Sequence, residues 1–161
     1  ISHQERDEGS EYYNRTMDYA ALLGVDVIIR PDLIGASRGT NEQGQKTYNL
    51  WDCYQNADFV TYPSTYEGFG NAFLEAVWFK KPILVNRYSI FQQDIEPVDF
   101  DVVVMDNYVT PETVQAVRAI LDTPEAVETM GNKNFELARH YFSYELLEQR
   151  LYQIMMNFGQ V

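Results

Sequence analysis

The sequence predicts an α/β fold in which an open parallel β-sheet carries helices on both faces. Short runs rich in β-branched residues alternate with stretches of helical periodicity, which is typical of parallel strands joined through helices. The 161 residues are 45% hydrophobic and 14% aromatic, which is enough for one domain with its own core. We therefore expect a single domain over residues 1–161.

The strands are predicted from runs of residues that favour extended backbone. These runs read VDVIIR, ADFVTYP, PILVNR and DVVVMD, at residues 25–30, 57–63, 82–87 and 101–106. A polar loop with three glycines follows the first run, at residues 31–47. A loop of that length in a compact domain is more often functional or mobile than idle.

Helical periodicity fills most of the remaining chain. The first helix is expected to stop at Gly24, because glycine is favoured just past a helix end. A later helix begins at Pro111 with Thr110 as its cap, and C-terminal helices run from about Pro124, with Ser143 capping the last piece. The helices are expected over residues 10–23, 48–56, 71–79, 111–121 and 124–158.

Charge and cysteine content argue against several classes of protein. The net charge of −12 argues against nucleic-acid binding, which needs clustered Lys and Arg. No apolar run is long enough to span a bilayer. The single cysteine, Cys53, cannot form an internal disulfide, and a free thiol suits the cytoplasm, where we expect the protein to be located. His3 and His140 lack Cys or acidic neighbours at metal-ligand spacing, so no metal site is expected.

Glu75 is the residue that first points to a function. It lies in NAFLEAVWF, residues 71–79, a run that is apolar on nearly every side and so predicts a helix buried all round. A buried carboxylate without a partner costs several kcal/mol. We therefore expect Glu75 to meet Lys80, Lys81, a backbone donor or a ligand.

The segment YPSTYEGFGN, residues 62–71, leads from a predicted strand into this helix. Ligands of open parallel sheets bind beyond the carboxyl ends of the strands. The two glycines that flank Phe69 let the backbone turn tightly, and free amides at the helix start suit a phosphate. Alternatively, Ser64 and Glu67 match a helix-capping box, which is a purely structural role. These residues alone leave both interpretations open.

Glu67 and Glu75 lie eight positions apart with the glycines between them. Within the nearly continuous match from Tyr54 to Val77, this spacing resembles the E-x7-E signature of retaining glycosyltransferases with the GT-B fold, family 4, also described as glycosyl transferases group 1. The resemblance extends more loosely over nearly all of the chain. It implies the Rossmann-like, C-terminal donor-binding half of an enzyme that transfers a hexose from a nucleotide diphosphate sugar to an acceptor.

The resemblance also implies roles for individual residues. Glu75 would accept hydrogen bonds from the ribose hydroxyls, and Glu67, the catalytic residue, would hold hydroxyls of the transferred sugar without acting as a nucleophile. The nucleobase would rest near residues 31–34. No cofactor or metal is implied, since the nucleotide sugar is a substrate. The implied substrate-binding residues are Glu67, Gly68, Phe69, Gly70, Asn71 and Glu75.

The sequence also departs from the family pattern. The Arg and Lys that hold the diphosphate in this family have no counterpart here. We therefore expect the first part of the donor domain and the N-terminal acceptor domain to lie outside these residues, and the isolated fragment to be inactive. Any peripheral membrane association would come through that other half. Arg87 could approach a phosphate or the acceptor, or could pair with Asp94 or Glu96.

Two alternatives to a glycosyltransferase remain open from the residues. A nucleotide-sugar epimerase of the same fold would need ionisable residues at the sugar. A non-catalytic nucleotide-sugar-binding module would keep the pocket without the chemistry. The base (uridine, guanosine or adenosine), the donor sugar and the acceptor stay open in all three interpretations.

Overall fold

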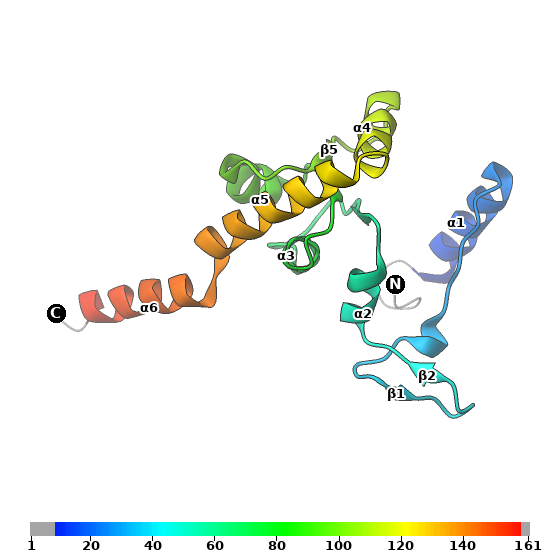
Figure 1. Ribbon diagram of the computed structural model, residues 1–161, viewed down its shortest axis with the longest axis horizontal. Helices are drawn as coiled ribbons and strands as arrows, with labels where there is room; N and C mark the ends of the chain where they lie inside the picture. The colour runs from blue at the N-terminus through cyan, green and yellow to red at the C-terminus, as the bar shows by residue number, and fades with distance from the viewer. Residues whose placement is uncertain (1–8, 159–161) are drawn as a thin grey trace. The chain divides into compact units, whose positions relative to one another are not determined.

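The computed structural model of the chain describes residues 9–158 (Figure 1). The chain divides into two compact units, and the boundary between them in the sequence lies between Cys53 and Tyr54. The expectation of a single domain over residues 1–161 stays a prediction. No helix within the described range is both long and apolar enough to cross a membrane.

The first unit contains one long helix and a short hairpin. Helix α1, Gly9–Leu23, ends at Gly24, whose φ of 64° confirms the predicted glycine stop. The predicted loop at residues 31–47 holds regular structure: the 3-10 helix η1 and two antiparallel strands. Their bounds are Pro31–Leu33 for η1, Gly39–Thr40 for β1 and Lys46–Thr47 for β2.

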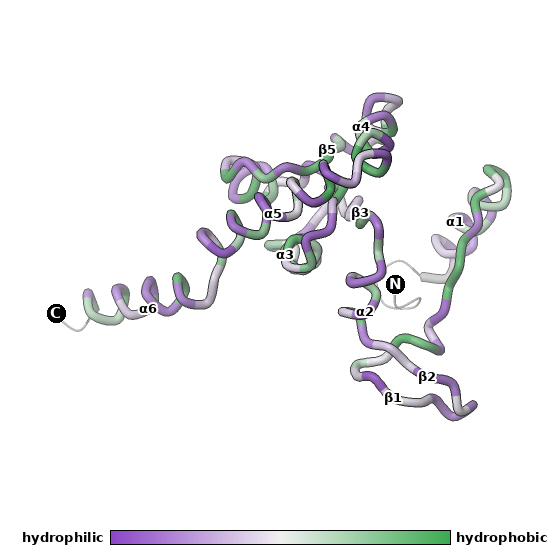
Figure 2. The backbone as a smooth tube through the Cα atoms, viewed as in Figure 1, coloured by the Kyte–Doolittle hydropathy of each residue, from purple (hydrophilic) through white to green (hydrophobic). Residues whose placement is uncertain are grey.

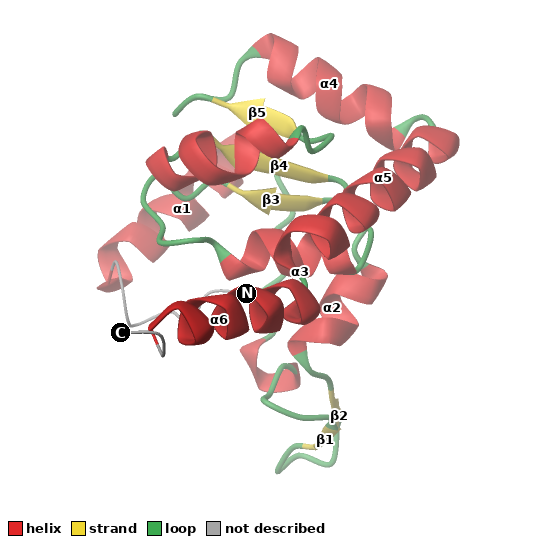
Figure 3. Ribbon diagram, turned by 90° about the vertical axis from the view of Figure 1, so that its left-hand side faces the viewer, coloured by secondary structure: helices red, strands yellow, loops and turns green. Residues whose placement is uncertain are grey.

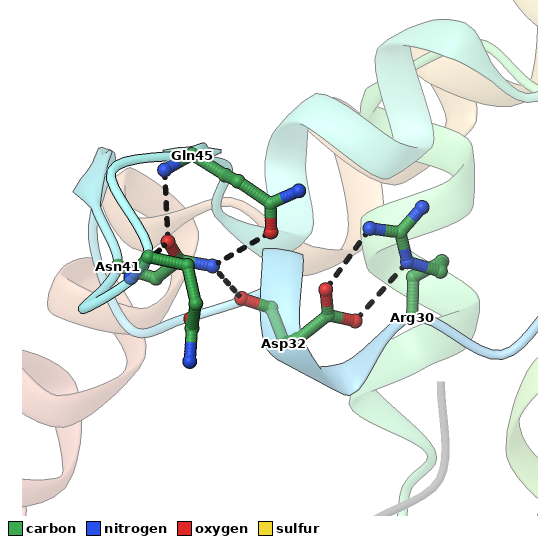
Figure 4. A network of polar contacts seen from close by, with 5 residues as sticks. Arg30, Asp32, Asn41 and Gln45 are labelled. Carbon is green, nitrogen blue, oxygen red and sulfur yellow. Dashed lines mark hydrogen bonds and ion pairs between the residues drawn. The ribbon is translucent and has the colours of Figure 1, made fainter.

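Side-chain hydrogen bonds hold the hairpin against η1 (Figure 4). The Asn41 Nδ2 group donates to the backbone oxygen of Asp32 at 3.3 Å and to Gln45 Oε1 at 3.2 Å. Arg30 forms an ion pair with Asp32 at 2.9 Å. These groups are exposed, so solvent screens each contact and its contribution to stability is small.

The strand predicted at residues 25–30 does not form. The segment appears as a hydrophobic stretch after α1 in Figure 2, and its apolar side chains are 38% to 84% exposed. β-Branched residues favour extended backbone, but a strand also needs a hydrogen-bonded neighbour. In the described part of the first unit, the β1–β2 hairpin is the only ladder, and it does not include this segment.

The second unit contains a parallel three-stranded sheet, which confirms the other three predicted strands (Figure 3). The strand order is β3-β4-β5, with Tyr62 opposite Val85 and Asn86 opposite Met105. The strands are Val60–Tyr62 (β3), Ile83–Asn86 (β4) and Val103–Met105 (β5). The helices are α3 (Asn71–Trp78), α4 (Pro111–Leu121), α5 (Pro124–Phe142) and α6 (Tyr144–Phe158). Two short helical turns, η2 (Phe91–Ile95) and η3 (Glu96–Val98), come between β4 and β5 in the sequence. Helix α2 (Leu50–Asn56) spans the boundary between the two units.

Alternate residues of β4 face opposite layers of helices. Ile83 and Val85 are buried in one cluster with Phe73 and Val77 of α3, and side chains of α5 pack against this cluster. Leu84 points to the other face, where Val117 and Ile120 of α4 cover it. This period of two is that of a strand buried on both sides. The prediction of helices on both faces of the sheet is therefore confirmed.

The predicted helix caps are also present. The Thr110 hydroxyl accepts a hydrogen bond from the Thr113 N–H at 3.3 Å and Pro111 follows it, so α4 begins with a complete capping box. The Ser143 hydroxyl accepts from the Leu146 N–H at 3.2 Å at the start of α6. Helices from residue 124 onward thus form as expected.

Asn134 of α5 ties this helix to the chain before β5, and we expect its loss to destabilise the second unit. Its side-chain amide, 1% exposed, accepts from the Asp101 N–H at 2.8 Å and donates to the Asp101 carbonyl at 2.7 Å. Asn134→Ala would leave both backbone groups unpaired and lower the free energy of unfolding by about 2 kcal/mol in urea titrations. Glu128→Ala, an exposed change on the same helix, should cost less than about 0.5 kcal/mol. Equal costs for the two variants would contradict the prediction.

Candidate functional site

The candidate site is the turn between β3 and α3, beyond the carboxyl end of β3. Helix α3 begins at Asn71, and Gly70 occupies the N-cap position in the left-handed region, with φ 89° and ψ 67°. Ser64 and Glu67 lie in the turn before it, where no helix starts. The capping-box interpretation of these two residues is therefore wrong.

Gly70 is buried at a position that admits no side chain. A Cβ atom there would overlap the hydroxyl of Tyr88 and lie 3.2 Å from a ring carbon of Tyr62. The positive φ adds strain for any residue other than glycine. Backbone geometry and close packing thus both require glycine at this position.

The backbone of the turn is held from the core side. The Tyr88 hydroxyl donates a hydrogen bond to the Phe69 carbonyl at 3.0 Å. The ring of Phe69 packs edge to face on Phe142 of α5, with centroids 5.2 Å apart. The side chain of Phe69 therefore anchors the turn by packing on α5, and its carbonyl is already bonded.

Four consecutive backbone N–H groups of the turn are available as donors. Within residues 9–158, the amides of these residues donate to no other group; they are Gly68, Phe69, Gly70 and Asn71. They lie at the start of α3, where the helix dipole favours negative charge. Such a row of donors can bind a phosphate or sugar oxygens.

Two tyrosines behind the turn respond to the charge of Glu67. The pKa of Tyr62 is raised above its usual range, chiefly by burial and then by interaction with the Glu67 carboxylate. Burial, followed by the Glu67 charge, raises the pKa of Tyr88 to about 12. Both phenols are therefore protonated donors near neutral pH.

The raised pKa of Tyr88 predicts a loss of stability at alkaline pH. A group with a higher pKa in the folded state contributes stability that is present below its unfolded pKa of about 10 and is lost as the pH rises through about 12. Urea unfolding from about pH 9 to about pH 12 should give a shallower fall for Tyr88→Phe than for the parent. Tyr141→Phe, at an exposed tyrosine of α5, should follow the parent. Identical slopes for the parent and Tyr88→Phe would contradict this assignment.

Glu75 lies on α3 but is only half-buried, so the helix is not buried all round as predicted. Trp78, one turn further on, is 63% exposed. The side chains of Lys80 and Lys81 bond elsewhere, to Asn132 Oδ1 at 2.8 Å and to the Gln55 carbonyl at 2.9 Å. In the described part of the chain, the Glu75 carboxylate has no hydrogen bond or ion pair. Pairing with either lysine or with a backbone donor is therefore wrong here.

The ends of the three strands are joined by Asn86, which sequence reasoning did not single out. Its side chain is 1% exposed, donates to the Ser64 carbonyl at 3.2 Å and accepts from the Asn107 N–H at 2.8 Å. These bonds connect the turns that follow β3 and β5 through the end of β4. A polar residue ending the apolar run ILVN was the available signal.

Other residues considered from sequence have plain structural surroundings. Arg87 pairs with Glu96 at 2.6 Å, which confirms one of its two interpretations. His140 is exposed in the last turn of α5, and His3 lies outside the described residues. Among residues 9–158, no three His, Cys, Asp or Glu side chains group closely enough to hold a metal. Residues 31–34, expected near a nucleobase, lie in the first unit.

Residues 40–136 match the family described as glycosyl transferases group 1. This match covers more than half of the chain and includes the whole turn. The chain belongs to this family. Its parallel sheet with flanking helices is similar to sucrose-phosphate synthase from Thermosynechococcus elongatus, with a TM-score of 0.68 and 17% sequence identity over 98% of this chain and 37% of that one. At this identity the likeness shows the fold, that of a GT-B glycosyltransferase.

Two curated glycosyltransferases are similar in sequence over most of the chain. One is the mannosylglucosylglycerate synthase of Thermotoga maritima, 31% identical over 157 residues and 89% of this chain. The other is the mannosylglucosylglycerate synthase of Petrotoga mobilis, 29% identical over 152 residues and 86% of this chain. The chain spans 35% of the length of each relative.

Proposed function

We propose that the chain is the donor-binding part of a retaining family 4 glycosyltransferase that transfers a hexose from a nucleotide diphosphate sugar. One observation carries the proposal. Glu67 and Glu75 stand on either side of a turn whose four consecutive N–H groups donate to nothing in the described structure. Membership of the glycosyl transferases group 1 family supports a donor sugar as the ligand of this turn.

In this proposal the turn binds the diphosphate and sugar, and the two glutamates bind hydroxyl groups. The N–H groups at the start of α3 stabilise the negative charge that develops as the diphosphate departs, because fixed donors need no reorganisation during the reaction. Glu67 accepts from hydroxyls of the transferred sugar, and Glu75 accepts from the ribose. The Glu75 carboxylate has no hydrogen bond or ion pair in the described chain, and this supports the ribose role.

In this proposal the reaction uses the nucleotide sugar as a substrate and needs no cofactor. The names of the two relatives support mannose as the first donor sugar to test and glucosylglycerate as the first acceptor. We further propose that the acceptor binds to a part of the protein outside these residues, so that the 161-residue fragment alone is inactive.

The test is a product assay with the full-length protein. It is incubated with GDP-, UDP- or ADP-hexoses and an acceptor, and the products are identified by mass spectrometry and NMR. Formation of a glycoside with the donor's anomeric configuration supports the proposal, and inversion of that configuration would rule out the retaining mechanism. An epimerised donor would instead indicate an epimerase. Nucleotide-sugar binding without turnover of any donor would indicate a binding module.

A further inference from the structure

Two tyrosines at the ends of neighbouring strands meet behind the proposed donor-binding turn. Tyr62 is the last residue of β3, and Tyr88 follows the end of β4 by two residues. Their rings contact edge to face, with centroids 6.2 Å apart and planes at 88°. Tyr88 is 2% exposed and belongs to the core of the second unit. The Tyr88 hydroxyl nevertheless reaches the backbone of the turn, which makes this tyrosine more than apolar packing.

Tyr88 determines the orientation of one peptide group. Its hydroxyl donates to the Phe69 carbonyl at 3.0 Å. A trans peptide is planar, and its C=O and N–H groups point in opposite directions. Because the Phe69 carbonyl is held toward Tyr88, the N–H of the following residue, Gly70, points away from Tyr88. Glycine adopts many backbone conformations at little cost, so this peptide would otherwise rotate easily.

Tyr62 packs against the same glycine. A Cβ atom on Gly70 would lie 3.2 Å from a ring carbon of Tyr62 and 3.4 Å from its hydroxyl. The two tyrosines thus close the core side of Gly70, and the hydrogen bond that fixes its peptide comes from Tyr88.

We propose that Tyr88 is a positioning residue of the glycosyl-transfer site. Tyr88 holds the Phe69–Gly70 peptide so that its N–H is available to the diphosphate. This inference rests on the proposed function, but the hydroxyl contact that carries it belongs to the chain itself.

The test removes each hydroxyl from the full-length protein while keeping the ring. In calorimetry, Tyr88→Phe should raise the dissociation constant of the parent's preferred nucleoside diphosphate about tenfold, because the peptide is no longer held. Tyr62→Phe removes the hydroxyl of the neighbouring ring and should leave that constant within about twofold. If Tyr88 had only a packing role, the two variants would not differ in affinity.

The matched control is Ile95→Val, which removes one methyl group from the same buried cluster without touching the turn. It should lower the melting temperature as much as Tyr88→Phe does, yet keep the parent's affinity. If Tyr88→Phe binds like the parent, or if Ile95→Val or Tyr62→Phe causes the same loss of affinity, the positioning role is wrong. If the parent binds nucleoside diphosphate without forming a glycoside, the proposed function fails while the affinity of Tyr88→Phe still decides the inference. If the parent does neither, both fail.

Discussion

Gly70→Ala is expected to lower the free energy of unfolding of the second unit by about 3 kcal/mol, the largest stability loss of any single methyl addition in the turn. Two costs combine. A left-handed backbone, here with φ of 89°, costs roughly 1–2 kcal/mol for a residue with a Cβ atom. The new methyl group would also overlap the Tyr88 hydroxyl and crowd the Tyr62 ring, and overpacking of this kind costs roughly 1–3 kcal/mol. Urea unfolding monitored by fluorescence measures the loss.

Gly68→Ala is the matched control for this prediction, because Gly68 has no positive φ and a Cβ atom added there would meet nothing within 4 Å. It should change the free energy of unfolding by less than about 0.5 kcal/mol. The double variant Gly70→Ala/Tyr88→Phe removes the atom that the methyl group meets, so it should lose less stability than the sum of the two single changes. A cost for Gly70→Ala as small as that of Gly68→Ala would show that Gly70 is not closely packed.

Hydrophobic periodicity predicted most elements of the second unit because the apolar residues that form the pattern are the ones that are buried. The β4 run ILVN is buried at every position, and α4 carries both its predicted proline and its threonine cap. The strand expected at residues 25–30 did not form, although this segment is equally rich in β-branched residues. Composition favours extended backbone, but it does not provide a neighbouring strand to pair with. Pairing depends on distant parts of the chain, which a local pattern does not contain.

The sequence predicted the residues of the candidate turn, but not the residues that hold the turn in place. The glycines and glutamates of the turn follow a recognisable spacing, so sequence pointed to them directly. Tyr88 and Asn86 reach the turn from beyond the next helix, at 19 and 22 residues from their partners Phe69 and Ser64. Their role depends on the parallel pairing of β3 with β4, which brings the ends of the two strands together. From sequence alone, a tyrosine in an apolar region predicts only packing.

For the helix around Glu75, the sequence pattern overestimated burial. A run that is apolar on nearly every side predicted complete burial, yet Trp78 is 63% exposed and Glu75 is half-buried. Hydrophobic periodicity reports which residues tolerate burial, and it does not report how much neighbouring structure covers them. Lys80 and Lys81, which could have neutralised Glu75, lie past the helix end. They donate instead to Asn132 of α5 and to the Gln55 carbonyl.

Glu75→Gln is expected to weaken nucleoside diphosphate binding by the full-length protein about thirtyfold, roughly 2 kcal/mol, as hydrogen bonds to a charged acceptor are worth about 1.5–3 kcal/mol. The same change should alter the free energy of unfolding by less than about 0.5 kcal/mol, because the carboxylate has no partner in the described chain to lose. Calorimetry with GDP, UDP and ADP measures the first quantity, and urea unfolding measures the second. Glu128→Gln, at an exposed position of α5, is the control and should change neither.

Glu75→Asp separates the charge of the side chain from its reach, because it keeps the carboxylate and withdraws it by one methylene group. If the carboxylate accepts from two ribose hydroxyls at fixed positions, the shorter side chain loses at least one of these hydrogen bonds, and affinity should fall about tenfold. If Glu75 acted only through its charge, the aspartate variant would bind like the parent and the glutamine variant alone would be impaired. Parent-like affinity in both variants, or a loss of more than about 2 kcal/mol of folding stability in Glu75→Gln, would instead give Glu75 a structural role and remove the ribose assignment.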